Sequence, residues 1–267
     1  MIDLKKITLE VTELSKTVGA FIRQEAGRIG SQNVKEKGLH DLVTYVDLEA
    51  EKRLVASLQR IVPEAGFVAE ENQELERKER FNWIIDPLDG TTNFIHGIPK
   101  YCVSVALADE DEIVSAVVFE INLAECFYAW KDGPAFLNGE EIKVSSTKVL
   151  EKSLIATGFP YSDYSLLTPY LGLFEELMRS TRGIRRLGSA ALDLAYVACG
   201  RFDLFFEYGL KPWDVAAGSL IVERAGGLLT DFKEGRNHIF GRQIVASNRQ
   251  VHAEFFEKLN RHFEGSI

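Results

Sequence analysis

Residues 83–94, with the sequence WIIDPLDGTTNF, constrain this chain more strongly than any other segment. An apolar run that predicts a strand over 81–85 passes directly into Asp86 and Asp89, and Gly90 then allows a sharp turn. The proline between the acids keeps Asp86 out of the helical conformation, so we expect both carboxylates to converge across a tight loop. The next three residues predict a short helix, whose free amides form an anion site. Carboxylates beside an anion site indicate a divalent cation, although D-x-x-D spacing alone is also typical of an ordinary acidic turn.

Three further segments place acids where predicted strands or helices meet. Asp47 lies at the start of a helix that ends before Pro63, and it would serve equally as the N-cap of that helix. Glu70 and Glu71 follow a predicted strand over 66–69. Asp214 opens a predicted helix, where capping explains it as well as metal binding does. Capping does not explain why four separate predicted strand-to-helix junctions all carry acids, and strand carboxyl ends are where open α/β sheets bind ligands.

The periodicity of the chain predicts a layered α+β fold. Apolar residues spaced three and four apart over 4–21 predict a long amphipathic helix, and residues 101–144 are rich in strands with an Asn138-Gly139 hairpin turn. After a strand over 153–157, we expect helices at 166–179, 189–199, 213–225 and 249–263, and strands at 202–206, 228–231 and 243–247. We therefore expect one domain over residues 1–267, with two lobes and a soft boundary near residue 150.

Composition excludes several classes of protein. At 267 residues and 46% hydrophobic content, the chain can bury a sizeable core. Its net charge of −9 argues against a general surface for nucleic acid or anionic membranes. Cys102, Cys126 and Cys199 form no C-x-x-C pair, and no long apolar run suggests a signal peptide or a membrane span. These features predict a reduced, cytoplasmic protein.

The acidic cluster also predicts the kind of metal. Carboxylate oxygens favour Mg²⁺, Mn²⁺ or Ca²⁺ over zinc or copper, and the five histidines form no metal-spaced pair. Converging carboxylates would raise one another's pKa values unless cations lay between them. We expect Mg²⁺, with Mn²⁺ as an alternative.

Taken together, these segments resemble the inositol monophosphatase family of Mg²⁺-dependent, lithium-sensitive phosphatases. The resemblance rests on DPLDGTTNF at 86–94 and on WDVAAG at 213–218 followed by ERAGG at 223–227, with Asp47 and Glu70 upstream. Residues 188–193, GSAALD, are similar to the substrate-pocket segment of the family. The resemblance implies a five-layer αβαβα sandwich and a homodimer.

The same resemblance implies a role for each site residue. The ligands of two or three Mg²⁺ ions would be Glu70, Asp86, the Leu88 carbonyl, Asp89 and Asp214. Glu70 and Thr91, with Asp47 behind Thr91, would orient the attacking water. The substrate would be bound by Asp89, Gly90, Thr91, Ser189, Ala190, Glu207 and Asp214. The amides of Gly90 and Thr91 would hold the phosphate, and the sugar or polyol hydroxyls would meet Ser189, Ala190, Glu207 and Asp214.

The implied activity is hydrolysis of a phosphate monoester, myo-inositol 1-phosphate first, by in-line attack of a metal-activated water. Fructose-1,6-bisphosphatases and 3′-phosphoadenosine-phosphate phosphatases of the same fold are alternatives, but Thr92-Asn93 resembles the inositol monophosphatase branch. A non-enzymatic protein that binds RNA polymerase or ribosome-assembly factors is a further alternative. Arg182, Arg185 and Arg186 would then suit a partner, although a solvated face or dimer edge explains them as well.

Overall fold

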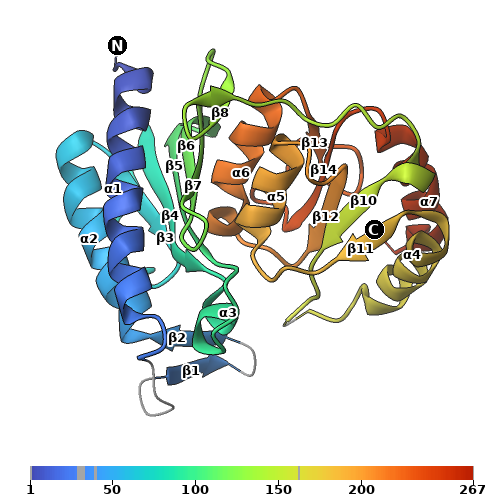
Figure 1. Cartoon of the computed structure of the whole chain (residues 1–267), viewed down its shortest axis with the longest axis horizontal. Coiled ribbons are helices and arrows are strands. Elements are labelled where there is room, and N and C mark those ends of the chain that lie inside the picture. The colour runs from blue at the N-terminus through green and yellow to red at the C-terminus, as the bar shows by residue number, and fades with distance from the viewer. Residues whose placement is uncertain (1, 29–33, 39–40, 162, 267) are drawn as a thin grey trace.

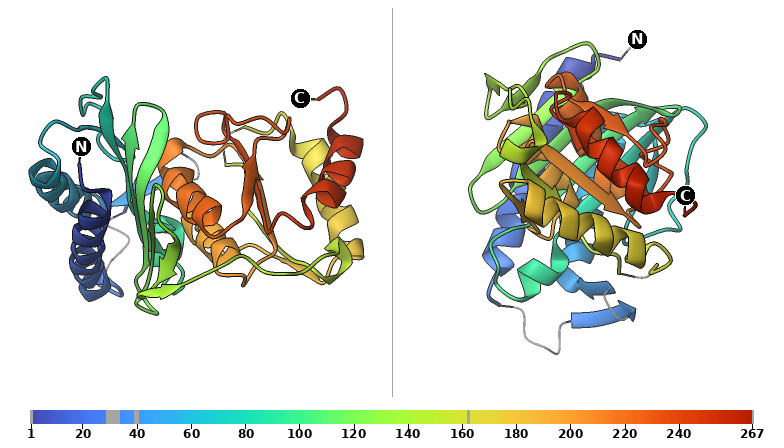
Figure 2. Two further views of the ribbon diagram at one scale, coloured as in Figure 1. Left: turned by 90° about the horizontal axis from the view of Figure 1, so that it is seen from above. Right: turned by 90° about the vertical axis from the view of Figure 1, so that its right-hand side faces the viewer.

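The computed structural model describes residues 2–28, 34–38, 41–161 and 163–266, which form five layers (Figure 1). A pair of helices, a large sheet, a second helix pair, a smaller sheet and a third helix pair follow one another across the molecule, and the view from above shows the same succession (Figure 2). The helices are α1 (Leu4–Glu25), α2 (Tyr45–Ile61), α3 (Thr91–Ile95), α4 (Leu167–Ser180), α5 (Ala190–Ala198), α6 (Pro212–Arg224) and α7 (His252–Phe263). The expected layered α+β fold is confirmed.

The larger sheet carries its strands in chain order. They are β3 (Gly66–Ala69), β4 (Phe81–Asp89), β5 (Cys102–Asp109), β6 (Glu112–Glu120), β7 (Glu125–Trp130), β8 (Ala135–Leu137) and β9 (Glu140–Glu141). β3 and β4 pair in parallel, whereas all later neighbours are antiparallel. α1 and α2 cover one face because their apolar stripes, including Val11, Val18 and Leu54, are buried there. The turn between β8 and β9 has positive φ at Asn138 and Gly139, as predicted.

The smaller sheet has the strand order β11-β10-β12-β14-β13. Its strands are β10 (Leu154–Thr157), β11 (Gly183–Arg185), β12 (Leu204–Tyr208), β13 (Leu228–Thr230) and β14 (Gln243–Ser247). β10 runs parallel to both β11 and β12, and the remaining pairs are antiparallel. α5 and α6 lie between the two sheets and share one buried cluster with both of them. Residue 150 falls between the two sheets in the chain, and the expected division into two lobes there stays a prediction.

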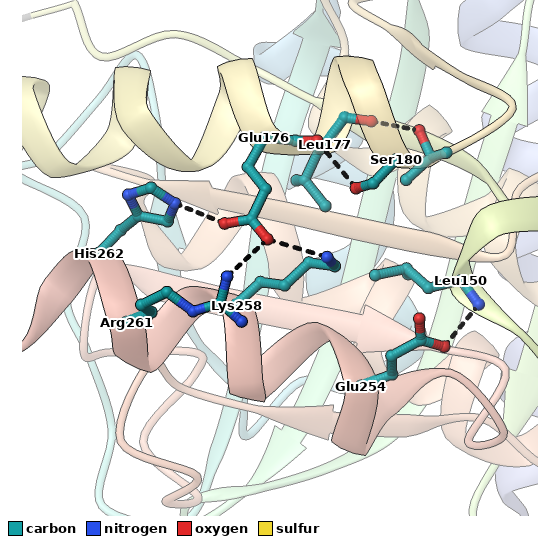
Figure 3. A network of polar contacts seen from close by, with 9 residues as sticks. Leu150, Glu176, Leu177, Ser180, Glu254, Lys258, Arg261 and His262 are labelled. Carbon is teal, nitrogen blue, oxygen red and sulfur yellow. Dashed lines mark hydrogen bonds and ion pairs between the residues drawn. The ribbon is translucent and has the colours of Figure 1, made fainter.

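A charged network joins the outermost helices, α4 and α7 (Figure 3). Glu176 Oε1 accepts from Lys258 Nζ at 2.9 Å and from Arg261 Nη1 at 3.0 Å, while Glu176 Oε2 lies 2.8 Å from His262 Nε2. The Glu176 carboxylate of α4 thereby binds three side chains on one face of α7 and helps to hold these two helices together over the smaller sheet.

The structure corrects several expected boundaries. β4 extends to Asp89, so Asp86 and Asp89 lie on a bulged strand end and not across a loop. The bulge falls where Pro87 cannot donate to the ladder. Thr44 is the N-cap of α2, and Asp47 is the third helical residue of a capping box. The helices expected at 166–179, 189–199 and 213–225 differ from the observed ones by one residue at each end, α7 begins three residues later than expected, and α1 ends four residues later. None of the described helices combines the length and apolar composition of a membrane span.

Candidate active site

The parallel pairing of β3 with β4 brings two acids together. Ala69 lies opposite Ile85, and the Glu70 amide extends the ladder by donating to the Ile85 carbonyl at 3.2 Å. The next residues along the two chains, Glu70 just after β3 and Asp86 within β4, therefore lie side by side, and the charge of Glu70 raises the pKa of Asp86. The register of one strand pair, and not a turn, places these acids.

A pocket of about 460 Å³ opens at this edge. Ten of the residues implied by the family resemblance line it, namely Glu70, Asp86, Leu88, Asp89, Gly90, Thr91, Ser189, Ala190, Glu207 and Asp214. Gly90 begins α3 with φ of 101°, and a Cβ there would lie 2.9 Å from the Lys100 carbonyl, so only glycine fits this turn.

Asp47 is buried behind the pocket wall and acts through Thr91. Its Oδ1 accepts from Thr91 Oγ1 at 2.9 Å, while its Oδ2 accepts from the Thr44 amide at 2.8 Å and the Thr44 hydroxyl at 2.6 Å. The alternative that Asp47 only caps α2 is therefore incomplete, because one oxygen serves the helix start and the other holds the pocket threonine. Burial raises the pKa of Asp47, and its hydrogen bonds to Thr44 and Thr91 oppose that rise.

Asp89 ties the large sheet to α5. Its Oδ2 accepts from Ser189 Oγ at 2.7 Å and from the Ala191 amide at 2.8 Å. Ser189 is the N-cap of α5, so the carboxylate lies at the amino-terminal end of the helix, where partial positive charge stabilises an anion. The residue that the sequence marks as a metal ligand thus also orients the substrate-pocket segment.

The smaller sheet contributes through the same geometry. β10 and β12 are parallel with Thr157 opposite Phe206, so Gly158, just after β10, lies beside Glu207, the next residue of β12. A Cβ at Gly158 would lie 2.1 Å from the Glu207 carboxylate, which therefore rests directly on the glycine backbone. The absence of a side chain at Gly158 makes room for a buried acid in the pocket.

The pocket acids repel one another strongly. Burial raises the pKa of Asp86 well above its usual value, and the charges of Glu70, Asp89 and Asp214 raise it further. Burial also raises the pKa of Asp89 to about 6 and, with the charge of Asp89, that of Asp214 to about 7. The negative charge of each of these acids is therefore less favourable in the pocket than in water, and a nearby positive charge would offset that cost.

The residues present fit a hard dication. The donors are carboxylate oxygens and the Leu88 carbonyl, and their charges are destabilised where they stand, so a cation among them would offset the repulsion. Within the ranges that the structure describes, no three acidic, histidine or cysteine side chains already surround one point.

Two details of the expected junctions are wrong. β3 continues through a loop into β4, so Glu70 does not precede a helix. Asp214 is the third residue of α6, after Lys211 at the N-cap and Pro212 at the first position. Its Oδ2 accepts from the Lys211 amide at 2.7 Å, so Asp214 does assist the helix start while lining the pocket.

The sequence interpretation missed three side chains near the site. Arg186 lines the pocket, although its basic cluster suggested a partner face or a solvated edge. Asp193 also lines the pocket and is 1% exposed. Glu51, buried one turn after Asp47, accepts from the Glu71 amide at 2.9 Å and holds the loop after β3. The spacing of four between Asp47 and Glu51 is the signal that would have found the last of these.

Fold and site together define a five-layer α+β protein with a carboxylate-lined pocket where strands of both sheets end. The model of the inositol monophosphatase family matches residues 3–266, and the chain belongs to that family. The family is typically Mg²⁺-dependent.

Known proteins resemble the chain over nearly its whole length. It is 40% identical over 258 residues to the Nus factor SuhB of Pseudomonas aeruginosa, covering 95% of each chain. It is also 40% identical over 244 residues to the inositol-1-monophosphatase of Rhizobium meliloti, covering 91% of this chain and 92% of the relative. The solved IMPase of Thermotoga maritima superposes with a TM-score of 0.87 at 37% identity, covering 96% of this chain and 98% of that one.

Proposed function

We propose that the protein hydrolyses a phosphate monoester, with myo-inositol 1-phosphate as its substrate, in a reaction that requires Mg²⁺. One observation carries the proposal: Glu70, Asp86, Asp89 and Asp214 line the same pocket as the start of α3, where Gly90 and Thr91 would receive the phosphate. The identity to the Rhizobium meliloti enzyme supports the choice of substrate.

The chain's own groups would position the attacking water. When Thr91 Oγ1 donates to Asp47 Oδ1, 2.9 Å away, its oxygen stays available as an acceptor. A water that donates to Thr91 and to the Glu70 carboxylate would then be oriented and partly deprotonated as it attacks phosphorus. Asp47 is a positioning residue in this scheme, because it acts only through Thr91.

Mg²⁺ bound by Glu70, Asp86, Leu88, Asp89 and Asp214 would activate water and neutralise charge on the phosphoryl oxygens and the leaving alkoxide. General acid–base catalysis supplies only about 10²–10⁴-fold, far less than the up to ~10²¹-fold acceleration reported for phosphate monoesters. The remainder has to come from charge compensation and positioning. We therefore propose direct in-line transfer to water without a phosphoenzyme.

The test is phosphate release from inositol 1-phosphate, fructose 1,6-bisphosphate and 3′-phosphoadenosine 5′-phosphate, each with Mg²⁺ and with EDTA. We expect Mg²⁺-dependent release that is fastest with inositol 1-phosphate. Asp89→Asn should keep the fold, because an amide oxygen can still accept from Ser189 and Ala191, yet lose most activity.

Asp109→Asn is the matched control, since this acid ends β5 on the surface in an ion pair with Arg80. Its turnover should equal that of the wild type. Release from none of the three substrates, or full turnover in Asp89→Asn, would overturn the proposed activity.

A second candidate is a binding role like that implied by the name Nus factor, which the Pseudomonas aeruginosa relative carries. Replacing the gene of that relative with this chain, as wild type or as Asp89→Asn, separates the two roles. Equal function of both versions would favour binding, whereas failure of only the variant would favour hydrolysis.

We also propose a homodimer, which sedimentation equilibrium would test.

A further inference from the structure

Asp193 is an acid in the pocket that the proposed hydrolysis does not use. It lies in the first turn of α5, lines the pocket and is 1% exposed. Among the described residues, nothing donates a hydrogen bond to its Oδ1 atom. A buried carboxylate oxygen without a donor is costly, so its retention in a ligand pocket calls for a ligand that supplies the donor.

The neighbours of Asp193 are charged and firmly held. Glu207, 7% exposed, is kept in place by its close contact with Gly158. Arg186 lies over the rings of Phe159 and Tyr161, 5.7 and 5.6 Å from their centroids, and donates to the Tyr161 hydroxyl. The buried Nε of Arg186 has no partner among the described residues. Arg186 lines the same pocket as Asp193 and Glu207. Burial raises the pKa of both acids well above the usual value, and the positive charge of Arg186 opposes that rise.

The charges at this end of the pocket favour one chemical class of ligand. Carboxylate oxygens accept hydrogen bonds from hydroxyl groups, whereas a second phosphate would meet two like charges and a single guanidinium. The guanidinium can compensate the pocket acids but leaves no surplus of positive charge for another anion. Neutral, hydroxyl-rich groups fit this end, and anionic groups are repelled.

We propose that Asp193 is a specificity-determining residue, which accepts a hydrogen bond from a hydroxyl of the substrate's uncharged polyol end and disfavours a second phosphate there. The inference deepens the proposed function and rests on it. It assigns to the pocket a substrate class, monophosphates of polyols, and assigns Arg186 to hold the two acids near one another by compensating their charge.

The experiment compares kcat and KM for inositol 1-phosphate and fructose 1,6-bisphosphate in the wild type and in Asp193→Asn. The substitution keeps the size of the side chain, removes its negative charge and adds amide donors that can face a phosphate. We expect KM for inositol 1-phosphate to rise about tenfold with kcat nearly unchanged, and the preference for the monophosphate to fall about tenfold.

Glu120→Gln is the matched control. Glu120 is 0% exposed and its Oε1 also lacks a partner among the described residues, but it lies at the end of β6 and does not line the pocket. It should leave the preference between the two substrates unchanged. Asp193→Ser is measured in parallel, with the thermal midpoint of each variant, so that one poorly folded variant does not decide the result.

The possible outcomes distinguish the role of Asp193 from the proposed hydrolysis. An active wild type whose substrate preference is unchanged in both Asp193 variants would overturn the role of Asp193 alone. An equal fall in kcat for both substrates together with a lower thermal midpoint would also overturn it, because that pattern marks a structural role. A wild type that releases phosphate from neither substrate would overturn the proposed function, and this inference with it.

Discussion

Thr91 links the proposed cation site to the proposed site of the attacking water, because its hydroxyl has only one hydrogen atom to donate. Its Oγ1 lies 2.9 Å from Asp47 Oδ1 and 2.9 Å from the Leu88 carbonyl, and a hydroxyl donates only one hydrogen bond at full strength. Donation to Asp47 frees the Leu88 carbonyl for a cation and leaves Thr91 as an acceptor for water. The buried position of Asp47 therefore affects which acceptor the Thr91 hydroxyl uses, Asp47 or the Leu88 carbonyl, more than it affects the start of α2.

At the residue scale, substitutions of the two adjacent acids after β3 distinguish a specific role in binding the cation and the water from the mere loss of a negative charge. Glu70→Gln should lower kcat by about 10²-fold or more and weaken Mg²⁺ binding together, because this carboxylate is expected to serve both the cation and the water. Glu71→Gln should stay within about twofold of wild type, since only Glu70 of the two lines the pocket. Steady-state kinetics and Mg²⁺ titration measure both effects. A change in substrate KM alone for Glu70→Gln would remove Glu70 from both roles.

Acids that follow an apolar strand could be found from the sequence, because strand ends gather at one sheet edge. Glu70 and Asp86 were found in this way, Asp89 from its spacing to Asp86, and Asp214 from its place at the start of a predicted helix. The structure places all four in one pocket. Arg186 was missed as a site residue because it falls within a basic cluster. Asp193 was included in the segment 188–193 but was given no role, because it falls within an apolar helix. Whether such side chains face a pocket depends on how α5 packs between the sheets, which no local pattern reports.

At the element scale, both sheets position an acid in the pocket in the same way, through a pair of parallel strands. β3 with β4 and β10 with β12 are parallel pairs in different sheets, and the residues after their paired ends are Glu70 with Asp86 and Gly158 with Glu207. α5 and α6 lie between the sheets and begin at the pocket with Ser189 and Asp214. The distance between these two helices therefore controls how the two sets of acids meet.

Gly218 sets that distance. A Cβ there would lie 2.5 Å from Leu194 Cβ and 2.6 Å from Leu194 Cδ1, so the Leu194 side chain of α5 packs directly on the backbone of α6. Gly218→Ala should lower the free energy of unfolding by about 1–2 kcal/mol, because overpacking costs about 1–3 kcal/mol and the better helix propensity of alanine returns up to ~1 kcal/mol. Turnover should fall as well, since α5 and α6 would move apart at the pocket. Urea unfolding and kinetics measure both.

Ser219→Ala is the control for Gly218→Ala, because its buried hydroxyl in the same helix has no partner among the described residues. Its stability should equal or slightly exceed that of wild type. Unchanged stability and turnover in Gly218→Ala would show that the contact between the two helices is loose.

Elements with a clear apolar pattern were predictable from the sequence, and elements without one were not. The long helices and the hairpin strands repeat their apolar pattern often enough to be recognised. β1 (Val34–Gly38), β2 (Asp41–Thr44) and β11 were missed because each has at most two apolar residues, whereas β3 and β10 are equally short but contain a run of three. The end of β4 was placed too early, because the acids and proline that signal a loop here occupy a bulge that still pairs with β5.

On the scale of the whole molecule, the pocket acids couple stability to pH and to Mg²⁺. Burial raises the pKa of Asp89 to about 6 and that of Asp214 to about 7, whereas both would titrate near 3.9 in the unfolded chain. Between about pH 4 and pH 7 the folded protein therefore binds more protons than the unfolded chain, so this contribution to stability is complete below about pH 4 and is lost as pH rises through the folded pKa values. His252 acts in the opposite direction, because burial lowers its pKa to about 4 and its contribution is lost as pH falls from about 6.5 toward that value.

Mg²⁺ competes with these protons, so its stabilising effect should grow with pH. We expect the Mg²⁺-induced increase in thermal midpoint to be larger at about pH 8 than at about pH 5.5, with each tenfold gain in affinity adding about 1.4 kcal/mol, or roughly 3 °C. Differential scanning calorimetry with Mg²⁺ and with EDTA at both pH values measures this difference, from which the effect of His252 cancels. The double variant Asp89→Asn with Asp214→Asn should lose most of the Mg²⁺ effect at both pH values. A Mg²⁺-induced shift of the same size at both pH values in the wild type would mean that protons and cations do not share these carboxylates, and the metal site would have to lie elsewhere.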